Sequence, residues 1–235
     1  MSEGCIVVGS GGLLGQALAR RFGREGLRLS LLGRRPEHLS EQVASLAAEG
    51  IEARSYPVDV GDSEALGLCL DLAEHQSGPT SVLIYNACAQ LAGHALKTSN
   101  ELFRSQIEAN VMGAFFAARP LGEAMRERGG GSILITGAAV AFQPVSTHVG
   151  LTVGKAALRA FAFCLADDLA PEVGVTIFEI TALIKTGDPV LDPDVIAARY
   201  WETHKQPTGQ TEILLPATWR PKPGGGSVWL FESAS

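Results

Sequence analysis

A glycine cluster near the start of the chain could hold a phosphate group. Gly9, Gly11 and Gly12 follow the apolar run Cys5–Val8 and precede an amphipathic segment, so they fall between an expected strand and an expected helix. Glycine permits a tight turn and a close backbone approach to a pyrophosphate, whose charge is stabilised by free N–H groups at the start of a helix. The pattern predicts a dinucleotide site, with Gly9, Ser10, Gly12, Leu14 and Gly15 as candidate contacts. The alternative is a tight turn that binds no ligand.

Two arginines form a second candidate contact. Arg34 and Arg35 follow the apolar run Leu29–Leu32, and Gly33 stands where an acidic residue would hydrogen-bond the ribose 2′-hydroxyl of NAD. Guanidinium groups suit a 2′-phosphate instead, because they form charge-assisted and often bidentate hydrogen bonds. The pair therefore favours NADP(H) over NAD(H) as the cofactor. The alternative is a solvated surface pair before the turn at Pro36.

Short apolar runs alternate with longer helical stretches along the chain, which is the pattern of repeated βαβ units. Such units give a parallel sheet with helices on both faces, so we expect an α/β protein with a single-domain doubly wound parallel sheet, a Rossmann fold, over residues 1–235. The expected strands are Cys5–Val8, Leu29–Leu32, Val82–Tyr85, Ser132–Thr136 and Val175–Ile180. The expected helices are Leu13–Arg24, Glu37–Glu49, Ser63–His75, Ser99–Arg128 and Gly150–Ala170.

Composition favours a small molecule as the binding partner. The chain has 19 lysine and arginine residues against 25 aspartate and glutamate residues, a formal charge of −6, which argues against nucleic acid and anionic membranes. Its apolar stretches are shorter than the ~20 residues of a membrane span, and no secretory signal is visible, so we expect a cytoplasmic protein. The four cysteines form no CxxC pair, and we expect no metal site.

The segment Gly150–Ala170 is apolar on most faces, so the sheet alone cannot cover it. A second copy of the chain is the natural cover, and we expect a homodimer or homotetramer formed through the helices Ser99–Arg128 and Gly150–Ala170. The prolines and glycines of Pro221–Ser227 predict that the tail, residues 221–235, is flexible.

From Cys5 to about Thr186 the sequence resembles the short-chain dehydrogenase/reductase family. Val8–Gly15 is similar to the TGxxxGxG loop of the family, Tyr85–Cys88 to its NNAG motif, and EANVMGAFF to the helix that carries a functional asparagine. The resemblance implies cofactor contacts from further residues: Asp59, Val60, Asn86, Ala87, Lys155 and Thr186. It implies that Asp59 meets adenine, that Lys155 binds the ribose, and that Thr186 reaches the nicotinamide amide or phosphate.

The catalytic pattern of the family is incomplete here. Gly154–Leu158 resembles the lysine end of the Tyr-x-x-x-Lys motif, which places Leu151 at the tyrosine position and Ala138 at the serine position. The resemblance implies that Lys155 and Asn110 remain from the catalytic group, while the proton donor is lost. A reduced carbonyl oxygen needs a proton and an oxyanion partner, and general acid catalysis contributes about 10²–10⁴ in rate.

His148 is the candidate substitute, because an imidazole near Leu151 titrates close to neutral pH. The alternative is a surface histidine without a catalytic role.

The end of the chain, Ile196–Gln206 and Glu212–Pro216, resembles the C-terminus of an atypical bacterial subgroup of the same family. The helical spacing of Tyr200, Trp201 and His204 favours a packing stripe over a substrate box, followed by a seventh strand at Thr211–Leu215.

Three functions remain open from the sequence. The first is an NADP(H)-dependent oxidoreductase acting on a small carbonyl or alcohol, in which His148, or a water held by Asn110 and Lys155, replaces the missing acid. The second is a catalytically silent NADP(H)-binding sensor or partner subunit. The third is a fold retained without cofactor, suggested by the departures from the glycine-loop and NNAG patterns at Val8, Leu13 and Cys88.

Overall fold

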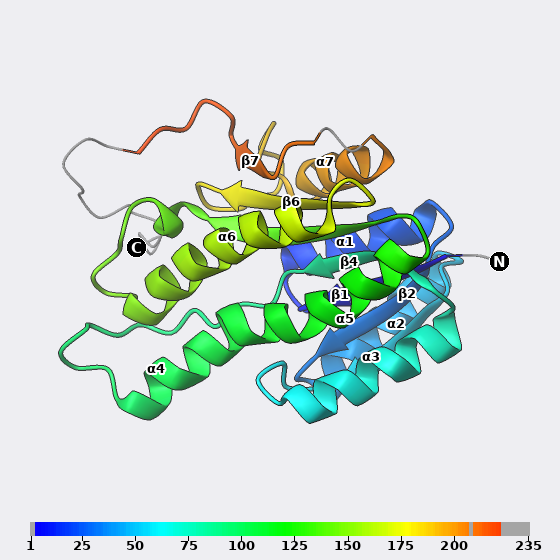
Figure 1. Cartoon of the computed structure of the whole chain (residues 1–235), viewed down its shortest axis with the longest axis horizontal. Helices are drawn as coiled ribbons and strands as arrows, with labels where there is room; N and C mark the ends of the chain where they lie inside the picture. The colour runs from blue at the N-terminus through cyan, green and yellow to red at the C-terminus, as the bar shows by residue number, and fades with distance from the viewer. Residues whose placement is uncertain (1–2, 207–208, 222–235) are drawn as a thin grey trace.

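The computed structural model describes residues 3–206 and 209–221, which contain a seven-stranded parallel sheet flanked by helices. The strand order is β3-β2-β1-β4-β5-β6-β7 and every neighbouring pair is parallel, which confirms the predicted doubly wound α/β fold (Figure 1). The strands are β1 (Gly4–Val8), β2 (Arg28–Gly33), β3 (Ala53–Pro57), β4 (Thr80–Tyr85), β5 (Gly131–Ala138), β6 (Val173–Ile180) and β7 (Glu212–Leu215).

The helices follow the strands in alternation. They are α1 (Leu13–Arg24), α2 (Pro36–Ala48), α3 (Ser63–Ser77), α4 (Asn100–Ile107), α5 (Gly113–Glu127), α6 (Val149–Leu169) and α7 (Pro193–Lys205). A π-helical segment, Glu108–Met112, joins α4 to α5, and a short 3₁₀ turn, Ala139–Ala141, follows β5.

The strands are buried on both faces, so they read as continuous apolar runs. One face packs against α3, α5 and α6 around side chains such as Leu83 and Ile133. The other packs against α1, α2 and α7 around side chains such as Val7 and Phe178. The strand order reverses between β1 and β4, and ligands of such sheets bind in the crevice outside the carboxyl ends of these strands.

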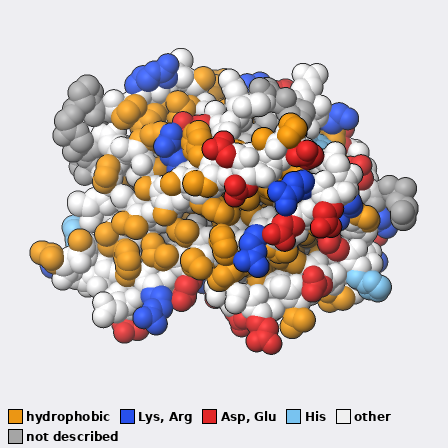
Figure 2. All heavy atoms as spheres, viewed as in Figure 1, with side chains coloured by type: hydrophobic (Ala, Val, Ile, Leu, Met, Phe, Trp, Pro, Cys, Tyr) orange, Lys and Arg blue, Asp and Glu red, His pale blue; other side chains and the backbone are white. Residues whose placement is uncertain are grey.

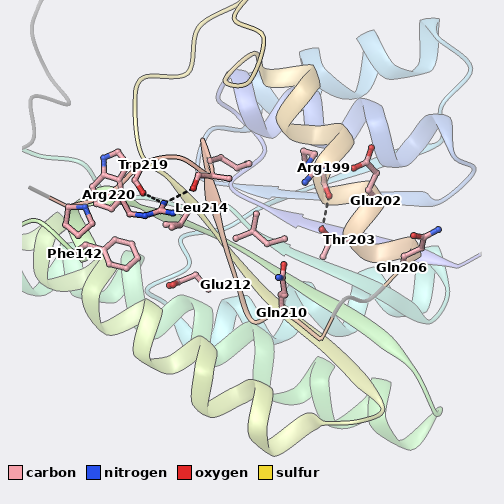
Figure 3. Close-up of a pocket in the computed structure, with 14 residues that line it drawn as sticks. Phe142, Arg199, Glu202, Thr203, Gln206, Gln210, Glu212, Leu214, Trp219 and Arg220 are labelled. Atoms are coloured by element: carbon pink, nitrogen blue, oxygen red, sulfur yellow. Dashed lines mark hydrogen bonds and ion pairs between the residues drawn. The ribbon is translucent and has the colours of Figure 1, made fainter.

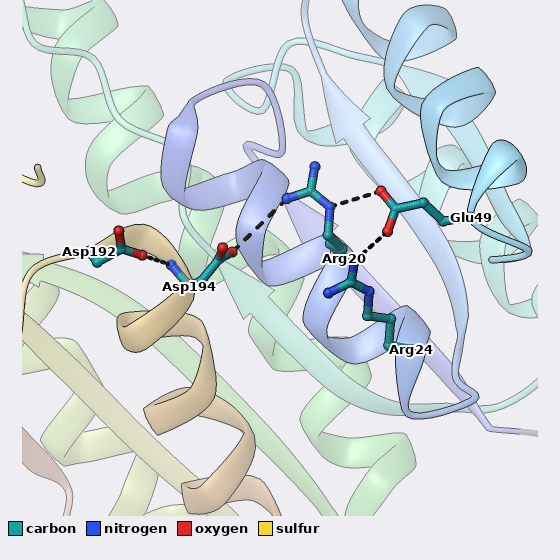
Figure 4. A network of polar contacts seen from close by, with 5 residues as sticks. All are labelled: Arg20, Arg24, Glu49, Asp192 and Asp194. Atoms are coloured by element: carbon teal, nitrogen blue, oxygen red, sulfur yellow. Dashed lines mark hydrogen bonds and ion pairs between the residues drawn. The ribbon is translucent and has the colours of Figure 1, made fainter. Parts of the chain in front are cut away.

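A polar network ties together three helices on the second face (Figure 4). Arg20 Nε and Arg24 Nη2 of α1 lie 3.0 and 2.7 Å from the carboxylate of Glu49, which ends α2. These two guanidinium groups hold the pKa of Glu49 below its usual value. Arg20 also lies 4.0 Å from Asp194 in the first turn of α7, so the network links the N-terminal half of the sheet to the last helix.

Two sequence expectations differ from the structure. The strand β3 is absent from the expected strands, because its residues ARSYP form no apolar run and only Tyr56 is buried at this edge of the sheet. The predicted helix Ser99–Arg128 is not one regular α-helix, since the π-helical segment interrupts it at Asn110. The other predicted helices, and the seventh strand, are confirmed to within two residues.

The helix α6 is long and apolar enough to cross a membrane by length and composition, but it packs along the sheet. Its inner side, including Leu158 and Ala162, is fully buried, so it is a core helix of the fold. Hydrophobic side chains gather over α5 and α6 on the opposite, outer side (Figure 2), where Phe115 and Phe163 are exposed. Except for Pro221, the tail predicted to be flexible lies outside the described residues.

Candidate cofactor and catalytic site

The glycine loop is fixed at the point where the strand order reverses. Gly9 has a φ of +83°, and a Cβ added there would lie 2.5 Å from the Ala87 backbone nitrogen, so only glycine fits without strain. The Gly9 N–H donates to the Leu32 carbonyl at 2.8 Å, and the Asn86 N–H donates to the Val8 carbonyl at 2.8 Å. The loop is therefore held between β1, β2 and β4.

The start of α1 leaves polar groups available for a ligand. Its N-cap is Gly12, which has no side chain to satisfy the first N–H groups of the helix. A Cβ at Gly11 or Gly12 would meet nothing within 4 Å, so the backbone is open on this side. The hydroxyl of Ser10 is buried and has no hydrogen-bond partner in the described part of the chain. These groups fit the phosphates of a dinucleotide.

A cavity of about 560 Å³ lies beside this loop. It brings together most of the residues that the sequence assigned to a cofactor: Gly9, Gly12, Arg34, Arg35, Asp59, Val60, Asn86 and Ala87. His38 and Cys88 also line it, and the sequence analysis did not single out either as a cofactor contact. Five predicted residues do not line it: Ser10, Leu14, Gly15, Lys155 and Thr186.

Gly15 contacts the glycine loop from within α1 and does not line the cavity. A Cβ there would lie 2.6 Å from the Gly9 carbonyl oxygen, so glycine lets α1 approach the loop closely. Leu14 is buried in the core against β1. Thr186 is exposed in the connection between β6 and α7.

A larger cavity of about 670 Å³ lies between β7, α7 and the segment that ends at Pro221 (Figure 3). Arg199, Glu202 and Thr203 of α7 line one side, while Phe142 and Trp219 line another. None of the predicted site residues lies there. The cavity beside the glycine loop is the better cofactor candidate, because it sits at the carboxyl ends of the central strands.

A chain of hydrogen bonds crosses the sheet behind the loop. Asn86 Nδ2 donates to the Gly9 carbonyl at 2.8 Å, and Thr136 Oγ1 donates to Asn86 Oδ1 at 2.9 Å. Since the Thr136 hydrogen is used in this way, the Tyr200 hydroxyl, 2.8 Å away, donates to Thr136. Tyr200 also stacks on Phe178 with ring centroids 3.7 Å apart. The predicted packing stripe is thus confirmed for Tyr200, and its hydroxyl adds a contact that the sequence did not reveal.

Asn110 lies in the π-helical segment, which is a frequent feature of functional sites. Its Oδ1 accepts from the Ala89 N–H at 2.9 Å and its Nδ2 donates to the Ala89 carbonyl at 3.0 Å. A Cβ at Gly154 would lie 2.7 Å from the Asn110 Cβ, so glycine lets α6 pack against this segment. Asn110 therefore fixes the loop that follows β4 close to Lys155.

Lys155 is almost fully buried on α6, and its Nζ donates to the Thr136 carbonyl at 2.7 Å. One turn earlier, Leu151 is 3% exposed and packs in a small apolar cluster with Val140 and Val145. Ala138 contacts the same cluster. The two positions that the resemblance aligns with the tyrosine and serine of the family, Leu151 and Ala138, therefore make apolar contacts.

His148 stands at the N-cap of α6 and is half-buried. Its Nδ1 lies 2.9 Å from the Thr147 hydroxyl, and its strand-like pairing with Gly93 joins the loop after β4 to the loop before α6. Neither His148 nor Gly93 lines the cavity beside the glycine loop. Burial lowers the pKa of His148, so the imidazole is neutral at neutral pH. A neutral imidazole is better suited to accept a proton than to donate one.

The seven-stranded parallel sheet, with a glycine loop and a cavity where the strand order reverses, is a fold of the Rossmann type. The model of the short chain dehydrogenase family matches residues 4–187, and the chain belongs to this family. In the residues that the structure describes, no cluster of histidine, cysteine and carboxylate side chains could hold a metal ion.

The chain is 31% identical over 165 residues to the 2,3-dihydro-2,3-dihydroxybenzoate dehydrogenase of Bacillus subtilis (strain 168), an alignment that covers 70% of this chain and 63% of that protein. Among solved structures it is similar to an L-sorbose reductase from Gluconobacter frateurii complexed with NADPH and L-sorbose, with a TM-score of 0.83, 23% identity and coverage of 91% and 95%. A short-chain dehydrogenase from Rhodopseudomonas palustris gives a TM-score of 0.80 and 27% identity, with coverage of 94% and 99%.

Proposed function

We propose that this protein is an NADP(H)-dependent oxidoreductase that acts on a small carbonyl or alcohol through a non-standard site. The observation that carries the proposal is the cavity beside the glycine loop, which has Arg34 and Arg35 on its rim and no acidic residue at Gly33. The complex of a similar fold with NADPH supports the same cofactor.

Each part of the site then has a role toward the cofactor, which supplies or accepts a hydride when bound. Backbone N–H groups after Gly12, with the Ser10 hydroxyl, would bind the phosphates, and Arg34 and Arg35 would hold the 2′-phosphate. Asp59 and Val60, which line the cavity, would hold the adenine. Asn86 and Ala87 line the cavity. By the family resemblance, Lys155 would bind the nicotinamide ribose and Thr186 would reach the nicotinamide end, although neither residue lines the cavity itself.

The substrate oxygen needs a group that exchanges a proton, because Leu151 and Ala138 offer none. His148 and Lys155 are the titratable candidates, and Asn110 keeps the neighbouring loop in place. Since the pKa of His148 is lowered, His148 favours proton acceptance, which corresponds to alcohol oxidation. Lys155 carries the proton for the reverse direction.

Replacing both arginines tests the cofactor assignment. Charge-assisted hydrogen bonds contribute about 1.5–3 kcal/mol each, so Arg34→Ala with Arg35→Ala weakens NADPH binding by roughly tenfold or more and leaves NADH binding nearly unchanged. Arg54→Ala is the matched control, because Arg54 is exposed on the neighbouring strand outside the cavity. An unchanged preference for NADPH in the double variant contradicts the assignment.

A second candidate function is an NADP(H)-binding sensor or partner subunit without turnover. The burial of Leu151 in an apolar cluster favours it, since no proton donor stands at that position. The two functions differ in one result: the sensor binds NADPH tightly yet consumes none with a panel of aldehydes, ketones and alcohols.

We also propose that two or four copies associate through the outer sides of α5 and α6, where exposed Phe115 and Phe163 would be covered, and that the protein is cytoplasmic. In this proposal the substrate is a small molecule, and neither nucleic acid nor a membrane is a binding partner. Light scattering of the purified protein distinguishes a monomer from either oligomer.

A further inference from the structure

A carboxyl group with no assigned role is buried beneath the candidate site. Glu179 lies on β6 and is 0% exposed, and neither of its side-chain oxygens has a hydrogen-bond partner among the described residues. An unpaired buried charge is costly, so a carboxyl in this position either finds a partner or keeps its proton. The reaction proposed above does not yet use this group.

The space for Glu179 exists because residue 137 is glycine. Gly137 of β5 is the direct partner of Glu179 in the sheet, and a Cβ added to Gly137 would lie 2.2 Å from Glu179 Oε2. The carboxyl therefore rests against the backbone of β5, directly after Thr136, whose carbonyl accepts the hydrogen bond from Lys155 Nζ. Glu179 and Lys155 thus meet the same short stretch of β5.

The charged and titratable groups around Glu179 come from three elements. Lys155 and Arg159 face it from α6, Glu212 from β7, and Tyr200 from α7. Arg159 is engaged by Glu212, with its Nη2 3.2 Å from Glu212 Oε2 and a second, shorter contact from Nε. Because Arg159 is paired with Glu212, Lys155 is the main cation that stabilises the charged form of Glu179.

Burial raises the pKa of Glu179 to about 8, and the charge of Lys155 offsets only part of this effect. Glu212 raises the pKa further. The Ala138 backbone N–H and Arg159 lower it. Glu179 is therefore the neutral acid at pH 7, which agrees with its lack of partners.

We propose that Glu179 is the proton reservoir of this site, a positioning residue that acts on the substrate only through Lys155. The proposal rests on the proposed oxidoreductase function. In this proposal the Lys155 ammonium gives the proton that a tyrosine hydroxyl gives in the family, and the buried acid Glu179 then reprotonates Lys155.

The proton balance of carbonyl reduction is simple. When a hydride from the cofactor reaches the carbonyl carbon, the π electron pair of the C=O bond becomes a lone pair on oxygen. An N–H bond of Lys155 breaks and gives this oxygen its proton. The O–H bond of Glu179 then breaks and its proton restores the ammonium through one intervening water, because the two side chains form no direct hydrogen bond. Glu179 ends as a carboxylate opposite Lys155 and takes a proton from water before the next cycle.

The protonation of Glu179 can be read without any cofactor, from the infrared C=O stretch of a neutral carboxyl. We expect this band at pH 7 in the free protein, with a titration midpoint near pH 8. Glu179→Gln removes the band, whereas Glu172→Gln keeps it, because Glu172 is exposed just before the same strand. Lys155→Met raises the midpoint by about one pH unit or more, since an ammonium no longer favours the carboxylate. Absence of the band at pH 7, or a midpoint that Lys155→Met does not move, overturns the proposal.

A second measurement separates this proposal from the proposed function. Titration with NADPH is expected to give the same affinity for wild type and Glu179→Gln. In the variant the kcat of NADPH consumption falls, and kcat no longer depends on pH near pH 8. A wild-type protein that binds no NADPH contradicts the proposed function. Normal binding with an unchanged kcat and pH profile in Glu179→Gln contradicts only the reservoir. If Glu179→Gln does not fold, Gly137→Ala serves instead, because its Cβ displaces the carboxyl.

Discussion

The buried Glu179 makes the stability of the protein depend on pH in a way that one substitution removes. The pKa of a glutamate is near 4.5 in the unfolded chain, and burial raises it to about 8 in the fold. Below pH 4.5 Glu179 is protonated in both the folded and the unfolded state, so its ionisation does not change the free energy of unfolding. As the pH rises from 4.5 to 8, the unfolded chain loses the proton while the fold retains it, and stability falls.

The size of this effect follows from the two pKa values. At about 1.4 kcal/mol per pH unit, the loss of unfolding free energy reaches roughly 5 kcal/mol above pH 8, as an upper limit. Glu179→Gln has no such term, since an amide does not titrate. The variant therefore gains stability relative to wild type as the pH rises, even if its buried amide lowers the free energy of unfolding by a constant amount.

Urea unfolding of wild type, Glu179→Gln and Glu172→Gln between pH 5 and pH 9 measures this difference. We expect the difference in unfolding free energy between Glu179→Gln and wild type to increase by several kcal/mol from pH 5 to pH 8. Glu172→Gln should follow the wild-type curve. Parallel curves for Glu179→Gln and wild type would refute the assignment of a neutral acid to this position.

Three further substitutions probe the loop, the sheet and the site. Gly9→Ala places a Cβ against the Ala87 backbone at a φ of +83°, so we expect loss of NADPH binding and a lower melting temperature, and normal binding would show that the loop is not the phosphate site. Tyr200→Phe keeps the ring stacking but removes the hydrogen bond to Thr136, so chemical unfolding should show a cost of about 1 kcal/mol, and no cost would mean that the bond is not formed. His148→Ala should abolish alcohol oxidation while the Kd for NADPH stays unchanged, and an unchanged rate would remove His148 from the mechanism.

The strands and helices were predictable because the apolar runs of a doubly wound sheet are long and continuous. The glycine loop was predictable too, since its conformation is demanded locally by Gly9 and by the close approach of Gly15 to the loop. The edge strand β3 was not, because it buries only Tyr56 and its other residues carry no apolar pattern.

The contacts within the site depend on residues far apart in the chain. The Tyr200 hydroxyl contacts Thr136 because α7 packs on the face of the sheet to which the Thr136 side chain points. Helical spacing cannot reveal this contact. Glu179 looks like an ordinary charged residue until its pairing with Gly137 shows that it is enclosed. The π-helical turn at Asn110 likewise packs against Gly154, a contact between residues far apart in the sequence.

The central claim, that this fold holds NADP(H), is tested most directly by calorimetric titration of the purified protein with NADPH and, in parallel, with NADH. We predict saturable binding of NADPH that is at least tenfold tighter than binding of NADH, as expected of one or more charge-assisted contacts to the 2′-phosphate. Equal affinity for the two would contradict the role of Arg34 and Arg35. Binding of neither would contradict the account as a whole.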